Sequence, residues 1–413
     1  MTNAAAEFRR FVDQHWDDAL TVGAWWELLG LAGWSDPTLP VDAYGRSLDV
    51  AAAAEVTAEL ERSGVLPGPV TFPGHLAAAT IVSHGSRSQI DRYVRRIVTG
   101  QDAWCQLFSE PGAGSDLASL SCRAVASDSD WLVTGQKVWT SEAAEADMGM
   151  LLARTDPDLP KRRGISWFAI SMDRPGIVVR PLRELTGRAI FNEVFLDDAW
   201  VEGDALVGGR AQGWAVAATT LAAERSSLSA GGLGGVSIRP GTKGGCLGLV
   251  VGDVLARQTT QELDSAALIA DPLGIVRRAA QRGSGQLSRS QRDALVRLYQ
   301  HAEVARLLQS RASEAEGGGH PVRGWPNIGK LASSALLREA AATVAAATGP
   351  HGMLHGYSPA SRSLLDRHAE GIDHDSSELV LFAPAASIYG GTDQVQRNII
   401  GERFLGLPRE PQT

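Results

Sequence analysis

The sequence predicts an α+β fold in which an N-terminal helical domain, a middle β domain and a C-terminal helical bundle follow one another. Apolar residues recur at helical spacing up to about residue 102, alternate with a period of two from about residue 103, and return to helical spacing after residue 212. The 413 residues exceed one ordinary core, so two or three domains are expected. We therefore assign residues 1–102, 103–212 and 213–413 to three domains.

The N-terminal domain is predicted from two amphipathic segments. Residues Asp49–Ser63 are rich in Ala and Glu with apolar residues at helical spacing, and Ser88–Thr99 repeats the pattern. Breakers such as Asp36-Pro37 and Pro67-Gly68-Pro69 lie between helices and indicate short turns.

The middle domain is predicted from short runs that are rich in β-forming residues and separated by turn residues. Because no helical segments alternate with these runs, a barrel or sandwich is favoured over a parallel, Rossmann-like sheet. The runs are Trp131–Val138, Met148–Arg154, Ile165–Met172, Ile177–Leu182 and Ile190–Leu196.

The C-terminal domain is predicted to be a helical bundle. Its segment 231–261 is Gly-rich, fits no period and is expected to be a loop or a short hairpin. The predicted helices are Trp214–Ser229, Arg289–Glu316, Asn327–Ala347, Ser376–Ile388 and a closing helix at about Asp393–Phe404.

Composition excludes several classes of function. The net charge of −8, without a basic cluster longer than Lys161-Arg162-Arg163, disfavours nucleic-acid binding. Apolar stretches such as Leu379–Ile388 are shorter than the ~20 residues that span a bilayer, so we expect no membrane association. The first residues lack the pattern of a signal peptide, and the three cysteines are widely separated, so a reducing cytoplasm is expected. No metal site is expected, because His351 and His355 lie among Pro and Gly without a nearby acid.

One segment has the composition of a ligand-binding turn. In Gln106–Asp116, a short apolar strand leads into Glu110-Pro111-Gly112-Ala113-Gly114-Ser115-Asp116, where the backbone can approach a ligand closely. A third Gly and a Gly-Lys-Ser/Thr ending are both missing, so the segment is neither a Rossmann fingerprint nor a P-loop. Its glycines alone would indicate only a tight turn after a strand.

The complete Gln106–Asp116 segment resembles the flavin-contacting strand and turn of the acyl-CoA dehydrogenase family. Three more segments agree in order and spacing. Gly135–Ser141 resembles the second flavin-contacting strand, and Leu206–Trp214, leading into Glu224-Arg225, resembles the junction with the C-terminal helices. Ile388–Arg397 resembles the loop and helix start that close the active site. Without the resemblance, Trp139 would be read as core and Thr392-Asp393 as a helix N-cap.

This resemblance implies an FAD-dependent α,β-dehydrogenation of an acyl-CoA thioester, with an electron-transferring flavoprotein as the electron acceptor. A carboxylate takes the α-proton while a hydride leaves the β-carbon for flavin N5. The acyl-CoA is expected near Ser115, Arg225 and the backbone N–H of Gly390. The flavin ring is expected to contact Gln106, Phe108, Ser109, Trp139, Thr140 and Ser141, and the nucleotide end of FAD to contact Thr392 and Gln394.

The base requires a separate argument, because Gly390 stands where many family members have their catalytic Glu. A minority of members place the carboxylate before an Arg on the first C-terminal helix, which Glu224-Arg225 matches. Ala217, Leu221, Glu224 and Leu228 recur at helical spacing, so Glu224 is expected in an apolar stripe that would raise its pKa. The competing interpretation is an exposed Glu, or one paired structurally with a neighbouring Arg.

Two departures leave alternatives open. The Arg-x-x-Phe-Gly motif that many members extend to the FAD diphosphate across a dimer is not evident, and 348–352 lacks the usual Gln and paired glycines. The chain is expected to form a homo-oligomer, or a heteromer with a related subunit. The alternatives are a flavin-dependent oxidase or monooxygenase on this fold, or a non-catalytic partner subunit. The acyl group is not predicted, because a pocket forms only in three dimensions.

Overall fold

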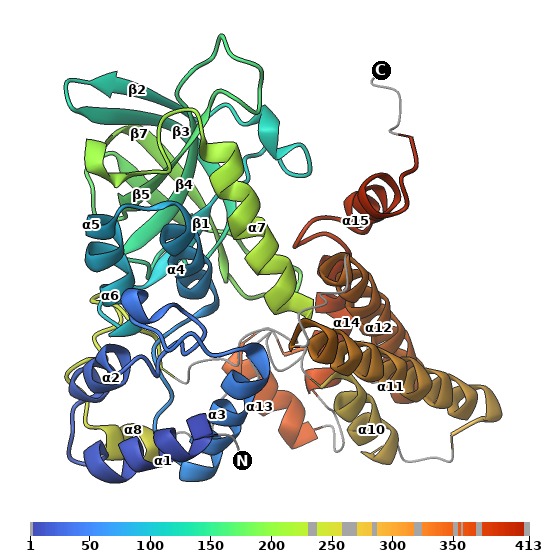
Figure 1. Ribbon diagram of the computed structural model, residues 1–413. Helices are drawn as coiled ribbons and strands as arrows, with labels where there is room; N and C mark the ends of the chain where they lie inside the picture. The colour runs from blue at the N-terminus through green and yellow to red at the C-terminus, as the bar shows by residue number, and fades with distance from the viewer. Residues whose placement is uncertain are drawn as a thin grey trace. The chain divides into compact units, whose positions relative to one another are not determined.

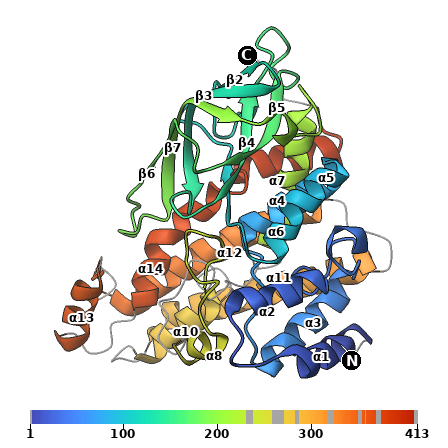
Figure 2. The ribbon, with the colours of Figure 1, turned by 90° about the vertical axis from the view of Figure 1, so that its left-hand side faces the viewer.

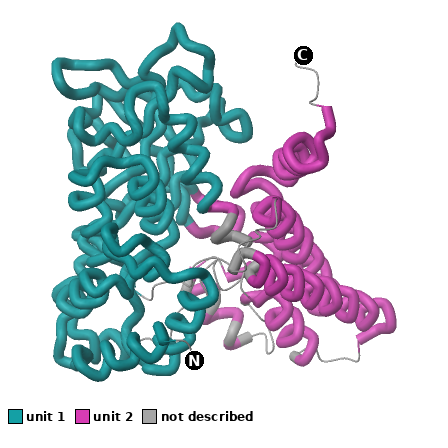
Figure 3. The backbone as a smooth tube through the Cα atoms, in the orientation of Figure 1, with its two compact units in different colours: residues 1–182, 189–223, 235–261 teal, residues 183–188, 224–234, 262–413 magenta. Residues whose placement is uncertain are grey.

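The computed structural model describes residues 3–229, 238–257, 271–282, 287–317, 324–349, 354–356, 358–368 and 374–408. They form two compact units (Figure 3), which are considered separately. Unit 1 comprises residues 1–182, 189–223 and 235–261, and unit 2 comprises residues 183–188, 224–234 and 262–413. The two predicted boundaries between the three domains stay predictions.

The N-terminal helices of unit 1 begin at side-chain caps. Thr21, Asp49 and Thr71 each accept a hydrogen bond from a backbone N–H in the first turn that follows. The predicted helix at Asp49–Ser63 is confirmed, and the second predicted segment contains two short helices joined by a π-helical turn, Ile90–Val94. The helices are α1 (Asn3–His15), α2 (Val22–Leu31), α3 (Val50–Ser63), α4 (Phe72–His84), α5 (Arg87–Gln89) and α6 (Arg95–Val98).

The strands of unit 1 form one eight-stranded mixed sheet (Figure 1) with the order β6-β7-β3-β2-β4-β5-β8, and β1 pairs in parallel with β4. All five predicted runs are strands. The strands are β1 (Trp104–Leu107), β2 (Arg123–Ser127), β3 (Asp130–Ser141), β4 (Met148–Arg154), β5 (Ile165–Ser171), β6 (Ile177–Pro181), β7 (Phe191–Val201) and β8 (Leu206–Val207).

The central strands are buried on both faces. Met150 and Leu152 of β4 belong to the core that α4 covers, whereas the alternate residues Leu151 and Ala153 belong to a second core formed among the strands. Figure 2 shows α4 and its neighbours beside the sheet. Burial on both sides explains why β4 is almost continuously apolar.

The segment that follows α7 (Gly213–Ser229) includes residues that pack back onto unit 1. We call residues 238–250 the strap. The backbone N–H groups of Val22 and Gly23 donate to the carbonyl oxygens of Leu249 and Leu247, at 2.8 and 2.9 Å. The prediction of a loop or short hairpin is confirmed for the strap, which contains no helix or strand, and was wrong for Val251–Arg257, which form helix α8. The rest of the Gly-rich segment lies outside the described residues.

The strap also contacts the turn between β3 and β4. Arg239 forms ion pairs with Glu142 and Glu145, and the backbone N–H of Thr242 donates to both carboxylate oxygens of Asp147, at 3.2 Å each. Lys243 Nζ donates to the carbonyl oxygen of residue 146 at 2.8 Å. The strap therefore holds the turn that directly follows the predicted flavin strand.

Unit 2 is a helical bundle, as predicted, with α12 packed against α10, α11 and α14. Its core contains Ile275, Leu298, Leu337, Val344 and Leu379, each at most 2% exposed. In the part of the chain that is described, no helix is long and apolar enough to cross a bilayer. The helices are α10 (Pro272–Arg282), α11 (Arg289–Gly317), α12 (Trp325–Thr348), α13 (Pro359–His368), α14 (His374–Phe382) and α15 (Asp393–Ile399).

Candidate active site

The Gly-rich turn after β1 is closed by its own backbone. Glu110 and Ala113 exchange two N–H···O bonds of 3.1 and 3.0 Å. Neither Gly112 nor Gly114 has a left-handed φ, and an added Cβ would meet nothing within 4 Å at either position. The turn itself therefore does not require these glycines. Their missing side chains leave the backbone open to a ligand.

A buried ion pair joins this turn to β3. Lys137 is fully buried, and its Nζ donates to Glu110 Oε1 at 2.8 Å and to the Phe108 carbonyl oxygen at 3.1 Å. Glu110 also accepts from the backbone N–H groups of Ser121 and Cys122, at 2.6 and 3.0 Å. Burial would raise the pKa of Glu110, but Lys137 and these N–H groups outweigh it and hold the pKa below its usual value.

Sequence reasoning missed this pair, although a signal was present. In β3, Lys137 occupies the same alternating face as the buried Trp131 and Val133. A lysine at an inward-facing strand position requires a buried partner.

The end of β3 departs from regular pairing. The β3–β7 register shifts between Lys137 and Thr140, and Trp139 between them has a φ of 59°. Left-handed backbone at a bulky residue costs about 1–3 kcal/mol and persists where surrounding contacts enforce it. The Trp139 side chain is 62% exposed, with its ring edge-on to Phe191 at 6.0 Å. The bulge therefore leaves an aromatic surface exposed.

The two predicted flavin-contacting segments lie side by side. The backbone N–H of Val138 donates to the Ser109 carbonyl oxygen at 2.9 Å. Phe108 is buried, whereas Gln106, Ser109 and Ser141 are half-buried. Thr140 is fully buried, and its hydroxyl has no hydrogen-bond partner among the described residues. The strands thus bring together the six residues predicted to line the flavin ring.

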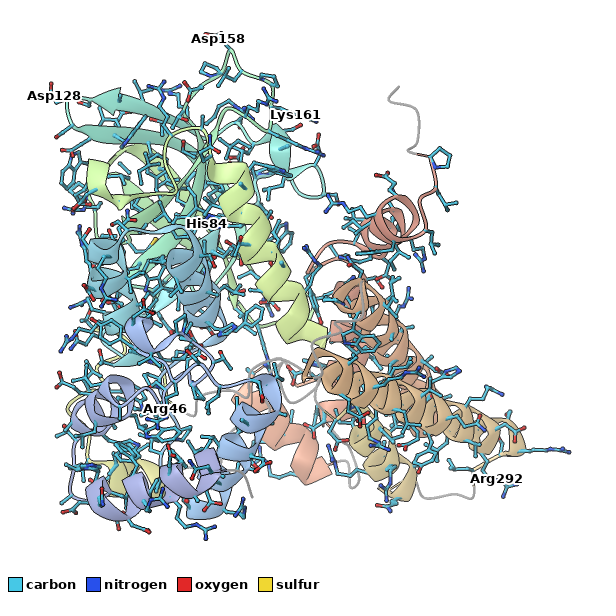
Figure 4. The ribbon with its side chains drawn as sticks, in the orientation of Figure 1. Arg46, His84, Asp128, Asp158, Lys161 and Arg292 are labelled. Atoms are coloured by element: carbon cyan, nitrogen blue, oxygen red, sulfur yellow. The ribbon has the colours of Figure 1, made fainter. Side chains whose placement is uncertain are left out.

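Ser115 lies in an exposed part of the same turn. Its neighbour Asp116 forms an ion pair of 2.7 Å with Lys161, which Figure 4 labels on the loop between β4 and β5. Both side chains of this pair are more than half exposed. The predicted substrate-contacting serine is therefore accessible on unit 1.

Helix α7 begins against the core of unit 1. Val216, Ala217 and Thr220 are buried, and the Thr220 hydroxyl lies 2.8 Å from that of Thr80 on α4. His84, labelled on α4 in Figure 4, has its Nε2 2.8 Å from the hydroxyl oxygen of Thr219. These contacts fix the orientation of the first turns of α7.

Glu224 lies further along α7, among the residues of unit 2. Ala217 and Leu221 pack against the first core, as the predicted stripe requires, whereas the Leu228 side chain is not among those described. Glu224 and Arg225 are both half-buried. Burial lowers the pKa of Arg225 and outweighs the negative charge of Glu224, which would raise it. A carboxylate therefore lies in a partly desolvated environment beside a cation.

The predicted closing loop lies in unit 2, before α15. Gly390 and Gly391 have φ values of 63° and 79°, and Gln396 Nε2 donates to their carbonyl oxygens at 2.8 and 3.2 Å. Thr392 is the N-cap of α15, since its hydroxyl oxygen accepts from the Val395 N–H at 3.2 Å. Gln394 is exposed.

A buried polar network, also missed from the sequence, supports this loop. Asp393 is 3% exposed and accepts from Lys330 Nζ at 2.8 Å and from the Ser334 hydroxyl at 2.7 Å. Arg338 approaches its other oxygen at 3.4 Å. Burial would raise the pKa of Asp393, but these partners outweigh it and lower the pKa. The signal available in the sequence was the spacing of Lys330 and Ser334, which are four residues apart and therefore lie on the same face of α12.

Among the described residues, no group of three or more His, Cys, Asp or Glu side chains is arranged to hold a metal ion. His355 is described and His351 is not, so the predicted absence of a site at this pair is not tested.

Three family models match the chain in sequence order. The N-terminal domain of acyl-CoA dehydrogenases matches residues 2–101, the middle domain residues 105–199, and the C-terminal domain residues 275–405. Together they cover most of the chain.

Named relatives agree with these models. Acyl-CoA dehydrogenase IpdE1 of Mycobacterium tuberculosis is 31% identical over 387 residues, which cover 94% of this chain and 88% of that protein. Acyl-CoA dehydrogenase FadE34 of the same organism is 37% identical over 366 residues, or 89% of this chain. The match spans only 44% of the length of FadE34.

Solved structures share the fold. The ChsE4–ChsE5 complex from Mycobacterium tuberculosis matches with a TM-score of 0.70 and 24% identity, covering 99% of both chains. A glutaryl-coenzyme A dehydrogenase in complex with glutaryl-CoA matches with a TM-score of 0.66 and 20% identity, covering 100% of this chain and 98% of that one. These structural matches establish the fold, and the domain models and IpdE1 establish that the chain belongs to the acyl-CoA dehydrogenase family.

Proposed function

We propose that the chain catalyses the FAD-dependent α,β-dehydrogenation of an acyl-CoA thioester, with Glu224 as the base that takes the α-proton. The observation that supports this assignment is the backbone of Gly390, whose φ of 63° disfavours any residue with a side chain. The nearby Asp393 is buried and held by Lys330, so it is not free to accept a proton. The base is therefore expected elsewhere, and Glu224 matches the alternative family position.

The proposed chemistry assigns each group a role. The α-proton passes to the Glu224 carboxylate, and the electron pair it leaves forms the Cα=Cβ bond as a hydride departs from the β-carbon. FAD, when bound, supplies the acceptor for that hydride. Because a thioester α-proton is weakly acidic, N–H donors at the carbonyl must stabilise the developing enolate, and we assign the Gly390 N–H to this role. Arg225, whose charge interacts with that of Glu224, would keep this carboxylate oriented.

The residues of unit 1 fit a flat flavin ring. Trp139 offers an exposed aromatic face, and the buried Thr140 hydroxyl is an unused hydrogen-bonding group. Ser109 follows β1 and Ser141 ends β3, on the two segments that the bond between Val138 and Ser109 joins. The Thr392 hydroxyl accepts a capping hydrogen bond but still has its own proton to donate to the nucleotide end.

Assembly with other chains is part of the proposal. On α11, four exposed apolar side chains recur at helical spacing, each 54–56% exposed, and such stripes often lie in interfaces. They are Val296, Tyr299, Val304 and Leu307. Because the ChsE4–ChsE5 structure is described as a complex, we propose either a heteromer or a homo-oligomer.

We also propose an electron-transferring flavoprotein as the electron acceptor and the cytoplasm as the location of the protein. The family does not favour the oxidase, monooxygenase or non-catalytic alternatives.

Anaerobic flavin bleaching tests the base assignment. Straight, branched and ring-bearing acyl-CoAs are mixed with the purified protein, and the decay of flavin absorbance is compared with that of Glu224→Gln. We expect the variant to bind flavin and acyl-CoA but to bleach about 10²–10⁴-fold more slowly. Glu61→Gln, an exposed helical position on α3, is the matched control and should react at the parent rate. A Glu224→Gln rate equal to the parent rate would show that another group is the base.

A further inference from the structure

Helix α7 carries the proposed base, and its apolar residues define its rotation only weakly. Five of the nine residues 215–223 are alanines, and their positions fall on all sides of the helix. Because the apolar stripe is therefore not pronounced, hydrophobic packing alone sets few constraints on which face of α7 meets the core. The polar contacts of the helix have to supply the missing constraint.

A buried hydroxyl bridge joins α7 to α4. Thr80 and Thr220 are both 0% exposed, and their Oγ1 atoms lie 2.8 Å apart. Thr80 Oγ1 also lies 2.7 Å from the carbonyl oxygen of Leu76, whereas Thr220 Oγ1 lies 3.4 Å from that of Val216. Since each hydroxyl has a single proton, we assign the Thr80 proton to the Leu76 carbonyl and the Thr220 proton to Thr80 Oγ1. The bridge is therefore a directed hydrogen bond from α7 to α4.

Other contacts hold the beginning of α7. One turn further along α4, His84 Nε2 lies 2.8 Å from the hydroxyl oxygen of Thr219. A Cβ added at Gly213 would come within 2.5 Å of the backbone of Ser166 in β5, and the Ser166 hydroxyl accepts from the Ala211 N–H at 2.9 Å. The close approach to β5 limits sliding of the helix, and the polar contacts with α4 limit its rotation.

The rotation of α7 determines the direction in which Glu224 points. Glu224 follows Thr220 by four residues, so the two side chains lie on the same face of the helix. A side chain that reaches about 5–6 Å from the axis moves by about 2 Å when the helix rotates by about 20°. A displacement of about 1 Å at a reacting group can slow a reaction about 10²-fold. A small rotation of α7 would therefore be enough to impair proton transfer.

We propose that Thr80 and Thr220 are positioning residues for the dehydrogenation, because their hydroxyl bridge sets the rotation of α7 and thereby the direction of the Glu224 carboxylate. This inference rests on the proposed function, since it takes Glu224 as the base. Both threonines act through Glu224 and not on the substrate. Loss of the bridge should therefore slow proton abstraction without weakening the binding of acyl-CoA.

Thr220→Val tests this inference, because valine keeps the branched shape of threonine and lacks the hydroxyl. Anaerobic flavin bleaching of the full flavin-loaded chain is followed at increasing concentrations of the acyl-CoA that bleaches the parent fastest. The limiting rate should fall about tenfold, because the base is misplaced. The half-saturating acyl-CoA concentration should stay within about twofold, because substrate binding is not changed. Thr220→Ser keeps the hydroxyl and should restore the limiting rate.

The partner threonine and a control complete the test. Thr80→Val removes the same bridge from α4, so Thr80→Val/Thr220→Val should bleach no more slowly than the slower single variant. The losses of unfolding free energy of the two single variants, measured with urea, should likewise not add in the double variant. Thr343→Val is the control, because it removes a buried hydroxyl that bonds within α12 at 2.7 Å, and it should keep the parent rate.

The outcomes separate this inference from the base assignment. A parent rate in Thr220→Val, together with a slow Glu224→Gln, would overturn the positioning role and leave the base in place. A Thr220→Ser rate as low as that of Thr220→Val would also overturn it, because the hydroxyl would not be the group that matters. Losses that multiply in the double variant would show that the two threonines do not act through one bridge. Bleaching of Glu224→Gln at the parent rate would overturn the base assignment, and this inference with it.

Discussion

Each compact unit contains a buried lysine–carboxylate pair next to residues that are assigned to the active site. The two pairs differ in the elements that they join and in the other partners of the carboxylate. In unit 1, Lys137 and Glu110 join two strand segments, and backbone N–H groups complete the carboxylate's contacts. In unit 2, Lys330 and Asp393 join two helices, and the carboxylate also contacts Arg338. Both pairs have Nζ–oxygen distances of 2.8 Å and almost no exposure.

The two pairs should differ in stability to mutation, because each carboxylate would keep different partners if its lysine were replaced. Asp393 would keep a second cation and the Ser334 hydroxyl, whereas Glu110 would keep two neutral N–H donors and the Ser121 hydroxyl. A buried carboxylate without a cation costs several kcal/mol, because its solvation by water is not replaced. The strand pair is therefore the more vulnerable support, and it lies beside the strained Trp139.

Lys137→Met should have the largest effect. We expect the free energy of unfolding to fall by about 3–5 kcal/mol, because Glu110 would be left buried without its cation. Flavin affinity should fall too, since the bond between Ser109 and Val138 and the Trp139 bulge depend on this junction. Urea unfolding and flavin titration measure the two effects.

The control for this variant is Lys161→Met, which breaks the exposed pair with Asp116 and should change the unfolding free energy little. If Lys137→Met and Lys161→Met lowered the free energy of unfolding by similar amounts, burial would not explain why the pair of Lys137 with Glu110 is stabilising.

Lys330→Met should be milder. A loss of about 1–3 kcal/mol is expected, because Arg338 and Ser334 still contact Asp393. Removing Arg338 as well, in Lys330→Met/Arg338→Met, should bring the loss close to that of Lys137→Met. If the double variant is no less stable than the single one, the second cation does not explain the difference between the pairs.

The pair of the half-buried His75 and the buried Asp36 should respond to pH, whereas the two lysine pairs should not. Burial would lower the pKa of His75, but Asp36, 2.8 Å from its Nδ1, outweighs this effect and raises it. Its stabilisation is therefore fully present below the unfolded pKa of about 6.5 and is lost as pH rises through the folded pKa. His75→Gln should cost about 1–2 kcal/mol at pH 6 and less at pH 9.

Urea unfolding at the two pH values measures this difference. The pKa values of Glu110 and Asp393 are lowered, so their stabilisation persists across this range and is lost only on acidification. The cost of Lys330→Met should accordingly be equal at pH 6 and pH 9. A cost of His75→Gln that does not vary with pH would contradict the charge assigned to this histidine.

The sequence predicted the elements well because local patterns define them. Periods of two and of 3.6 located five of the eight strands and the helices α7, α11, α12, α14 and α15, but not α10 or α13. The partners of Lys137 and Lys330 could not be predicted, because a single sequence gives no spacing rule for residues 27 and 63 positions apart. The contacts of the strap could not be predicted for a similar reason, since they are long-range and its glycines suppress any period. Family resemblance supplied the active-site residues, and their roles remain predictions.

The strap has a consequence for the order in which the protein assembles during synthesis. The turn with Glu142 and Asp147 leaves the ribosome long before Arg239 and Thr242, which later contact it. The sheet can therefore form first, with these carboxylates in water, and the strap can dock only after it has been synthesised. A truncated chain that ends before residue 238 should fold its strands, but its turn would lack the contacts with the strap. The loss of protease cleavage at this turn would then measure how fast the strap docks in the full-length chain.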